Sequence, residues 1–276
     1  MNPQMHAPIT LNPDGFNEIR MCRTGPMIYN KNDIYAGGSL QKYGEFSWLE
    51  REMFEQIVRP GQVVVEAGAN IGAHTVSLAR LVGARGAVLA FEPQRIVFQT
   101  MCANLALNQC SNVAAYQEAL GAADGEIVAP APNPALRTNF GALSLHGVTQ
   151  GNKVRLRRLD SLALPLCHVL KIDVEGMEAE VLEGARGTIG RCRPTLYIEN
   201  DRPDFSSDLI KRVFELGYDA FWHLPPLYNP DNFAGEAENI FPGILSANML
   251  CTPAELKVSI QGARRISSAD DTWRVN

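Results

Sequence analysis

The sequence has no uninterrupted apolar run close to the roughly 20 residues that a membrane-spanning helix requires. Its amino-terminal segment, MNPQMHAPITLNPDGF, also lacks the basic stretch followed by an apolar stretch that is typical of a secretory signal. We therefore expect neither a membrane span nor secretion, and we interpret the protein as cytoplasmic.

An excess of basic residues is missing as well. The 25 Lys and Arg are outnumbered by 30 Asp and Glu, which gives a formal charge of −5 at pH 7. Non-specific binding of nucleic acid depends on cationic side chains that displace counterions. The one basic run, KVRLRR at 153–158, alternates as in a strand, and we interpret it as a solvated strand face. The composition therefore argues against a nucleic-acid partner.

Closely spaced cysteines are absent. No CxxC pair occurs, and the five histidines show no metal-ligand spacing. Disulfide frameworks and zinc sites both depend on such spacing. We expect reduced and mostly buried thiols at the six scattered positions Cys22, Cys102, Cys110, Cys167, Cys192 and Cys251.

From Gly61 onward, short apolar runs alternate with longer helical patterns. The patterns predict strands at 63–68, 87–93, 113–120, 168–173, 194–200, 218–224 and 244–253, and helices at 73–82, 95–108, 177–189 and 208–217. This alternation predicts an α/β fold with a doubly wound, Rossmann-like, mainly parallel sheet. No helical pattern separates the last two strands, so we expect a hairpin that places an antiparallel strand at one edge.

We divide the chain into a lead-in, residues 1–45, that packs on the core, and one domain, residues 46–276. The Pro/Asn/Gly-rich segment 225–243 is expected to be an inserted loop, and loops of this length are commonly functional. We assign it to substrate binding, because its polar and aromatic side chains suit a polyhydroxylated ligand: Tyr228, Asn229, Asp231 and Asn232. The composition is compatible with a monomer or a homodimer.

In VVVEAGANIGAHT (63–75), Glu66 ends a predicted strand, and Gly68 and Gly72 open the next helix. Glycine lets the backbone turn sharply and approach a ligand, and ligands of open α/β sheets bind at the carboxyl ends of the strands. Glu92 ends the following strand, 20 residues after Gly72, at the spacing of a carboxylate that accepts ribose hydroxyls. A tight strand–helix turn alone would explain the glycines equally well.

The glycine spacing indicates which nucleoside is bound. The loop lacks the G-x-G-x-x-G of dinucleotide sites and reads E-x-G-x-x-x-G, which suits S-adenosylmethionine because Glu66 can help to orient its ammonium group. Glu118, near the end of the third predicted strand, is a candidate contact of the adenine amino group or a solvated strand-end acid.

With VVVEAGANIGAHT, AFEP, RRLDSL, LKIDVEGMEAEVLEGA and RPTLYIEN in this order, the chain resembles the FkbM-type methyltransferases over roughly residues 40–200. That family is similar to class I S-adenosylmethionine-dependent enzymes and usually methylates hydroxyl groups on sugars, polyketides and other natural products. The resemblance implies a class I methyltransferase fold and S-adenosylmethionine as cofactor. It also implies that the segment between 221 and 251 selects the substrate.

The resemblance assigns roles to individual residues. It implies that Glu92 holds the ribose and that the methionine end of the cofactor is lined by Glu66, Gly68, Asn70 and Gly72. In the lead-in segment SLQKYGEFSWLE (39–50), it implies that Tyr43 or Glu45 covers the cofactor.

The stretch VLKIDVEG (169–176) sets Lys171, Asp173 and Glu175 at the end of a buried strand. Methylation of a hydroxyl requires alignment of the acceptor and removal of its proton. Asp173 is the first candidate base, Glu175 the second, and His223 an alternative at the same edge. Structural interpretations stay open: a Lys171–Asp173 ion pair, a helix-start acid at Glu175, and a packing role for His223. A further alternative is that Asp173 binds the ammonium group of the cofactor and that another group is the base.

The next strand ends in Glu199 and Asn200. An Asp on one strand end and an acid–Asn pair on the next resemble the magnesium site of catechol-type O-methyltransferases. Oxygen ligands of this kind suit Mg²⁺. Asp173, Glu199 and Asn200 are therefore the candidate ligands if Mg²⁺ is used, although use of the metal is the less favoured option.

Taken together, the sequence predicts an S-adenosylmethionine-dependent methyltransferase that methylates a hydroxyl on a sugar or secondary-metabolite acceptor, either a small molecule or a glycan. Two other functions stay open, a nicotinamide-dependent oxidoreductase and a non-catalytic Rossmann-like binding module. Within the enzyme interpretation, a nitrogen or carbon acceptor is also open.

Overall fold

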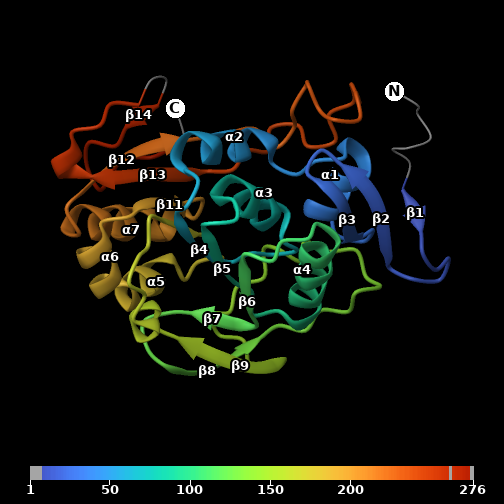
Figure 1. Ribbon diagram of the computed structural model, residues 1–276, viewed down its shortest axis with the longest axis horizontal. Helices are drawn as coiled ribbons and strands as arrows, with labels where there is room; N and C mark the ends of the chain where they lie inside the picture. Colours follow the sequence, from blue (N-terminus) through green and yellow to red (C-terminus); the bar gives the residue numbers. More distant parts are fainter. Residues whose placement is uncertain (1–7, 261–262, 274–276) are drawn as a thin grey trace.

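The computed structural model describes residues 8–260 and 263–273 (Figure 1). In this part of the chain, an eight-stranded sheet has the order β14-β12-β13-β11-β10-β4-β5-β6. Its centre is parallel and consists of β4 (Val63–Ala67), β5 (Ala87–Phe91), β6 (Val113–Tyr116), β10 (Val169–Ile172) and β11 (Thr195–Glu199). The predicted doubly wound, mainly parallel α/β sheet is confirmed.

The sheet beyond β11 is antiparallel. β13 (Asn248–Pro253) lies between β11 and β12 (Tyr218–His223) and runs antiparallel to both. The short β14 (Arg264–Arg265) pairs antiparallel with β12 at the outer position. The predicted hairpin of β12 and β13 is therefore present. Its second strand, β13, is not at the edge of the sheet, as we expected, but lies between β11 and β12.

Helices cover both faces of the sheet (Figure 1). One layer contains α2 (Trp48–Ile57), α3 (Ala73–Val82) and α4 (Arg95–Leu107), and the other contains α5 (Glu178–Gly184), α6 (Arg186–Cys192) and α7 (Pro203–Glu215). Side chains alternate along each strand and so supply both layers. Val64 and Val169 pack with α2 and α3, whereas Val65 and Leu170 pack with α5 to α7.

Two elements that were each predicted to be continuous are divided in the structure. The strand expected at 113–120 breaks at Gln117, because β7 (Glu118–Leu120) leaves the main sheet and pairs with the basic strand β9 (Asn152–Arg157). With β8 (Gly125–Ala129), these strands form a separate small sheet. The helix expected at 177–189 is interrupted at Ala185 and becomes α5 and α6.

The described part of the lead-in forms a small antiparallel sheet and one helix: β1 (Ile9–Thr10), β2 (Asn17–Cys22), β3 (Gly25–Asn30) and α1 (Ala36–Tyr43). Met27 and Tyr29 are buried with Met101 of α4, so this unit packs on the core. The first seven residues of the predicted lead-in lie outside the described residues. Short 3-10 helices complete the fold: η2 (Leu159–Leu162) and η3 (Ala254–Leu256).

None of the helices in the described ranges is both long enough and apolar enough to cross a membrane.

Candidate active site

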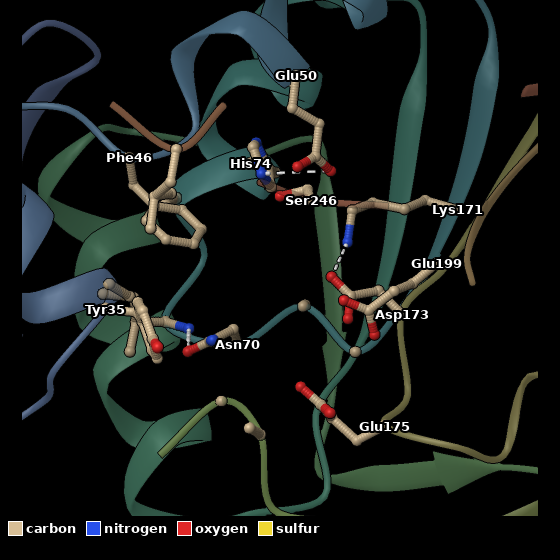
Figure 2. A pocket seen from close by; sticks show the side chains of 18 of the residues that line it. Tyr35, Phe46, Glu50, Asn70, His74, Lys171, Asp173, Glu175, Glu199 and Ser246 are labelled. Atoms are coloured by element: carbon tan, nitrogen blue, oxygen red, sulfur yellow. Dashed lines mark hydrogen bonds and ion pairs between the residues drawn. The ribbon is translucent and has the colours of Figure 1, made fainter. Parts of the chain in front are cut away.

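A cavity of about 300 Å³ opens at the carboxyl ends of β4, β5, β10 and β11. Its floor is made by strand-end side chains (Figure 2). Its walls come from three segments that are distant in the sequence: the end of the lead-in with α2, residues 139–142, and residues 227–248. The carboxyl ends of parallel strands are the expected ligand site of an open α/β sheet.

Glu66, at the end of β4, is 1% exposed and lines the cavity. Its Oε2 accepts a hydrogen bond from the Thr75 hydroxyl at 2.7 Å, whereas its Oε1 is buried and has no partner among the described residues. Burial raises the pKa of Glu66 to about 7. A buried polar atom without a partner is costly, so this oxygen is suited to a donor from a ligand.

Gly68 brings two strand ends into direct contact. Its φ is 80°, and a Cβ at this position would lie 1.7 Å from the carbonyl oxygen of Asp173. No larger residue fits without moving β4 away from β10. Gly72, the residue before α3, also has a positive φ. It packs against Met101 of α4 and is not among the described residues that line the cavity.

Glu92, after β5, is held in a fixed orientation. One carboxylate oxygen accepts the N–H of Asn70 at 3.0 Å, and the other accepts the N–H of Gln94 at 2.8 Å. The side chain is 5% exposed, and burial raises its pKa to about 7. Asn70 lies in the cavity wall near Tyr35 (Figure 2). The orientation leaves lone pairs of Glu92 available to a ligand.

A smaller apolar pocket adjoins the cavity and shares Gly68 and Glu92 with it. Its apolar lining comes from Phe91, Leu120, Leu143 and Met177, and Glu118 also lines it. Glu118 pairs with Arg157 at 2.6 Å, an interaction that also ties β7 to β9.

Lys171 and Asp173 form the predicted pair, at 2.9 Å, and β10 lies beside β4 as expected. Burial lowers the pKa of Lys171, but the carboxylates of Asp173, Glu66 and Glu50 raise it above its usual value. Burial raises the pKa of Asp173, but Lys171 and a hydrogen bond from Glu199 hold it below its usual value. Lys171 is therefore a buried ammonium, and Asp173 is ionised.

Glu175 follows in a left-handed conformation, with a φ of 59°. It pairs with Arg202 at 2.6 Å, while burial and the charge of Asp173 raise its pKa to about 8. It precedes α5, and Glu178 is the acid that accepts the N–H groups of Val174 and Gly176 at the start of that helix.

The proposed magnesium ligands are only partly brought together. Side-chain oxygens of Asp173, Glu175 and Glu199 lie within 4.8 Å of one another, and Asp173 and Glu199 are side by side in Figure 2. The side chain of Asn200 instead donates to the sulfur of Met249 at 3.3 Å. Consecutive residues of a strand point to opposite faces, so Asn200 does not join the acids, and Glu175 takes the place expected for it.

His223 and Tyr43 lie outside the cavity lining that the described residues form. The Nδ1 of His223 is 2.7 Å from the hydroxyl of Tyr197, and burial lowers its pKa. The hydroxyl of Tyr43 accepts the N–H of Ile240 and donates to the carbonyl of Glu238. Both side chains are therefore engaged in packing rather than directed at a ligand.

Glu45, like Tyr43, lies outside the described cavity lining and is bonded to the segment 225–243. Its carboxylate accepts hydrogen bonds from the side chain of Asn229 and the N–H of Phe233 and pairs with Arg23. Together with Tyr43 it fixes the segment 225–243 in place. The polar residues of that segment are largely used within it: the amides of Asn229 and Asn232 bond to backbone carbonyls of the loop.

Several cavity residues were not predicted from the sequence. Glu50 and His74 face each other at 3.7 Å in the upper wall, beside Phe46 (Figure 2). Burial and Lys171 lower the pKa of His74 to about 3, so it is neutral. The segments 39–50 and 63–75 contain these three residues, Phe46, Glu50 and His74. The sequence pattern of these segments did not distinguish cavity-lining residues from residues of the core.

Residues 139–142 gave no sequence signal at all. The segment belongs to the long excursion 130–152 and reaches the cavity because Thr138 is held by the lead-in, where its carbonyl accepts the N–H of Ile34 at 3.0 Å. The side chain of Gln94 holds the carbonyl of Phe140 at 2.9 Å.

A family model described as the methyltransferase FkbM domain matches residues 66–220. No curated protein matches the chain. Among solved structures, the chain is similar to the FkbM methyltransferase from Methylobacillus flagellatus KT, with 20% identity and a TM-score of 0.45 over 73% of this chain. It spans 50% of the length of that protein.

Another similar structure is the O-methyltransferase TomG from Streptomyces achromogenes, involved in tomaymycin synthesis and solved in complex with S-adenosylmethionine. The identity is 12% and the TM-score 0.45, over 75% of this chain and 78% of TomG.

Proposed function

Because the chain belongs to the FkbM methyltransferase family, we propose that it transfers a methyl group from S-adenosylmethionine to a hydroxyl of a small-molecule or glycan acceptor. One observation carries this proposal. A single cavity is lined by acids from three neighbouring strand ends, Glu66, Glu92 and Asp173. The turn after β4, which also lines this cavity, requires glycine at position 68.

The residues present fit this cofactor. The free Oε1 of Glu66 suits an ammonium donor, and the fixed carboxylate of Glu92 suits two ribose hydroxyls. The adjoining apolar pocket, lined by Phe91, Leu120, Leu143 and Met177, suits the apolar faces of a purine. When bound, S-adenosylmethionine supplies an activated methyl group on a sulfonium.

The residues of the chain then have three tasks. The cavity walls align the acceptor, and alignment alone is worth about 7–11 kcal/mol in well-oriented reactions. The buried Lys171 pairs with Asp173 and keeps its carboxylate ionised at the floor of the cavity. A carboxylate of the group Asp173, Glu175 and Glu199 takes the proton of the hydroxyl, a contribution of about 10²–10⁴ in rate.

A sugar or a secondary metabolite is the acceptor that the lining from residues 227–248 suits best. Ser246 and Asn248 supply groups that bind hydroxyls, and Leu227 and Ile244 supply apolar contact. Such a mixed wall is typical of small-molecule sites.

The test is methyl transfer from radiolabelled S-adenosylmethionine to three panels: mono- and disaccharides, phenols, and primary amines. We expect label in a hydroxyl compound, and loss of incorporation in Glu92→Ala at a cofactor concentration that is sufficient for the wild type. Label confined to the amine panel would contradict the O-methylation. Incorporation that Glu92→Ala leaves unchanged would contradict the assigned cofactor site.

A further inference from the structure

A second hollow adjoins the cavity, between the neighbouring helices α5 and α7 (Figure 1). It has a volume of about 580 Å³, and two residues of the excursion 130–152 complete its lining. We call it the α5–α7 groove. Gly176 and Arg202 line this groove, whereas the residues directly before them, Glu175 and Asp201, line the cavity. The groove and the cavity therefore meet at the turn after β10 and at the start of α7.

The boundary between them is one ion pair. Arg202 binds the carboxylate of Glu175 at 2.6 Å, and Glu175 lies at the lower edge of the cavity in Figure 2. The side chain of Arg202 lies across Gly176, which has a φ of 103° and whose added Cβ would be 3.4 Å from two of its atoms. Glycine therefore keeps the boundary thin. A ligand of two linked units can have one unit in the cavity and the next in the groove.

Part of the groove lining is apolar. Phe205 of α7 is 55% exposed, and its ring shares the groove with Leu209, Ala179 and Ala122. An aromatic ring that stays accessible in a hollow offers a flat apolar face to a ligand. Hollows of roughly 300–1,000 Å³ with mixed apolar and polar lining are typical of small-molecule sites.

The charged side chains of the described groove all have partners. Besides the ion pair at the boundary, Arg212 binds Asp208 at 2.6 Å, and His146 lies 3.5 Å from Glu180. Of the two remaining acids, one pairs with Arg186 and the other accepts backbone N–H groups. A charged ligand would find no unpaired opposite charge here, and burial of an unpaired charge is costly. The groove therefore suits an uncharged ligand.

A sugar ring matches this lining better than an alkyl chain. Hydrogen bonds to charged groups are stronger than those between neutral groups, so the paired side chains at the groove are good partners for hydroxyls. An alkyl chain would exclude water from these side chains without replacing its hydrogen bonds. A sugar ring has an apolar face for Phe205 and hydroxyls around its edge.

We propose, on the basis of the function proposed above, that the α5–α7 groove is a second sugar subsite and that the acceptor is an oligosaccharide or a glycan chain rather than a single sugar. The unit that is methylated lies in the cavity. The neighbouring unit stacks on Phe205, and its hydroxyls bind the charged groups of the groove. Linked units in adjacent sites bind more tightly than either unit alone.

The test measures saccharide binding to the protein saturated with S-adenosylhomocysteine, by saturation-transfer NMR. The probes are the glucose, mannose, galactose and N-acetylglucosamine series, each with one, two and three linked units. In at least one series we expect the second unit to raise the affinity by at least about tenfold. In Phe205→Ala we expect this gain to fall below about threefold. The affinity of this variant for S-adenosylhomocysteine should stay near that of the wild type, because Phe205 does not line the described cavity.

Two further variants serve as controls. Phe205→Trp keeps an aromatic face and is expected to keep the gain from the second unit. Leu256→Ala removes another large apolar side chain, 63% exposed, which does not line the described groove. It is expected to keep the gain as well.

The proposal is overturned if no series gains from a second unit, or if Phe205→Ala keeps the full gain. It is also overturned if the octyl glycoside of a single sugar shows the same Phe205-dependent gain as the disaccharide, because the groove would then bind an apolar chain. Failure of the proposed function is distinct from these outcomes, since S-adenosylhomocysteine would then not bind the wild-type protein.

Discussion

At the scale of single residues, Glu66 shows a conflict between stability and ligand binding. The side chain is almost fully buried, and one of its oxygens has no partner in the described structure. Burial raises its pKa from 4.5 to about 7, so between these values the folded protein holds a proton that the unfolded chain has lost. Stability therefore falls as the pH rises through this window.

We predict that Glu66→Gln stabilises the ligand-free protein above pH 7. The difference between a pKa of 4.5 and one of about 7 corresponds to about 3 kcal/mol, which is the upper bound of the effect. Below pH 4.5 the variant and the wild type should have the same free energy of unfolding. Urea unfolding at several pH values measures this, with Glu126→Gln, at a 71% exposed side chain, as control. A stability difference that is constant with pH would contradict the prediction.

The sequence was sufficient to predict which strand-end acids surround the cavity, because strand periodicity and the glycine turn fix their depth in the sheet. Glu66, Glu92, Asp173 and Glu199 all lie there. It was not sufficient to predict their states. Which acid has a cationic partner depends on Arg202, and nothing in the local pattern indicates that this side chain turns back to Glu175.

At the scale of elements, the interrupted helix between 178 and 192 has an identifiable cause. Asp160, from the quoted RRLDSL motif, accepts the N–H groups of Gly187 and Thr188 and the hydroxyl of Thr188, at 2.7 to 2.8 Å. It thus caps α6 from outside the helix. The hydrophobic periodicity of residues 177–189 cannot reveal a capping residue that comes from another segment. The sequence pattern therefore predicted one continuous helix.

We predict that Asp160→Ala lowers the free energy of unfolding by about 0.5–2 kcal/mol, the usual cost of losing such a cap. The affinity for S-adenosylhomocysteine should not change, because Asp160 does not line the described cavity. Asp208→Ala removes an exposed partner of Arg212 and is the control, with an expected effect of at most about 1 kcal/mol and smaller than that of Asp160→Ala. Urea denaturation of the three proteins gives the values. Equal effects of the two substitutions would argue against the capping role.

At the scale of the whole molecule, the cavity is assembled from a predictable floor and a poorly predictable cover. The floor follows from the strand order. The cover depends on contacts between distant segments, such as Tyr43 with Ile240 and Ile34 with Thr138. These contacts hold Tyr43 against the segment 225–243, outside the lining of the described cavity, and they bring residues 139–142 to the cavity. Local sequence patterns do not specify such pairings.

The central claim is that this cavity binds S-adenosylmethionine, and its most direct test is calorimetric titration of the purified protein with S-adenosylhomocysteine. We predict micromolar binding, about −8 kcal/mol, and at least tenfold weaker binding by Glu92→Ala, because our proposal assigns the ribose hydroxyls to the oriented carboxylate of Glu92. No binding to folded wild-type protein, or equal binding by the variant, would contradict the account.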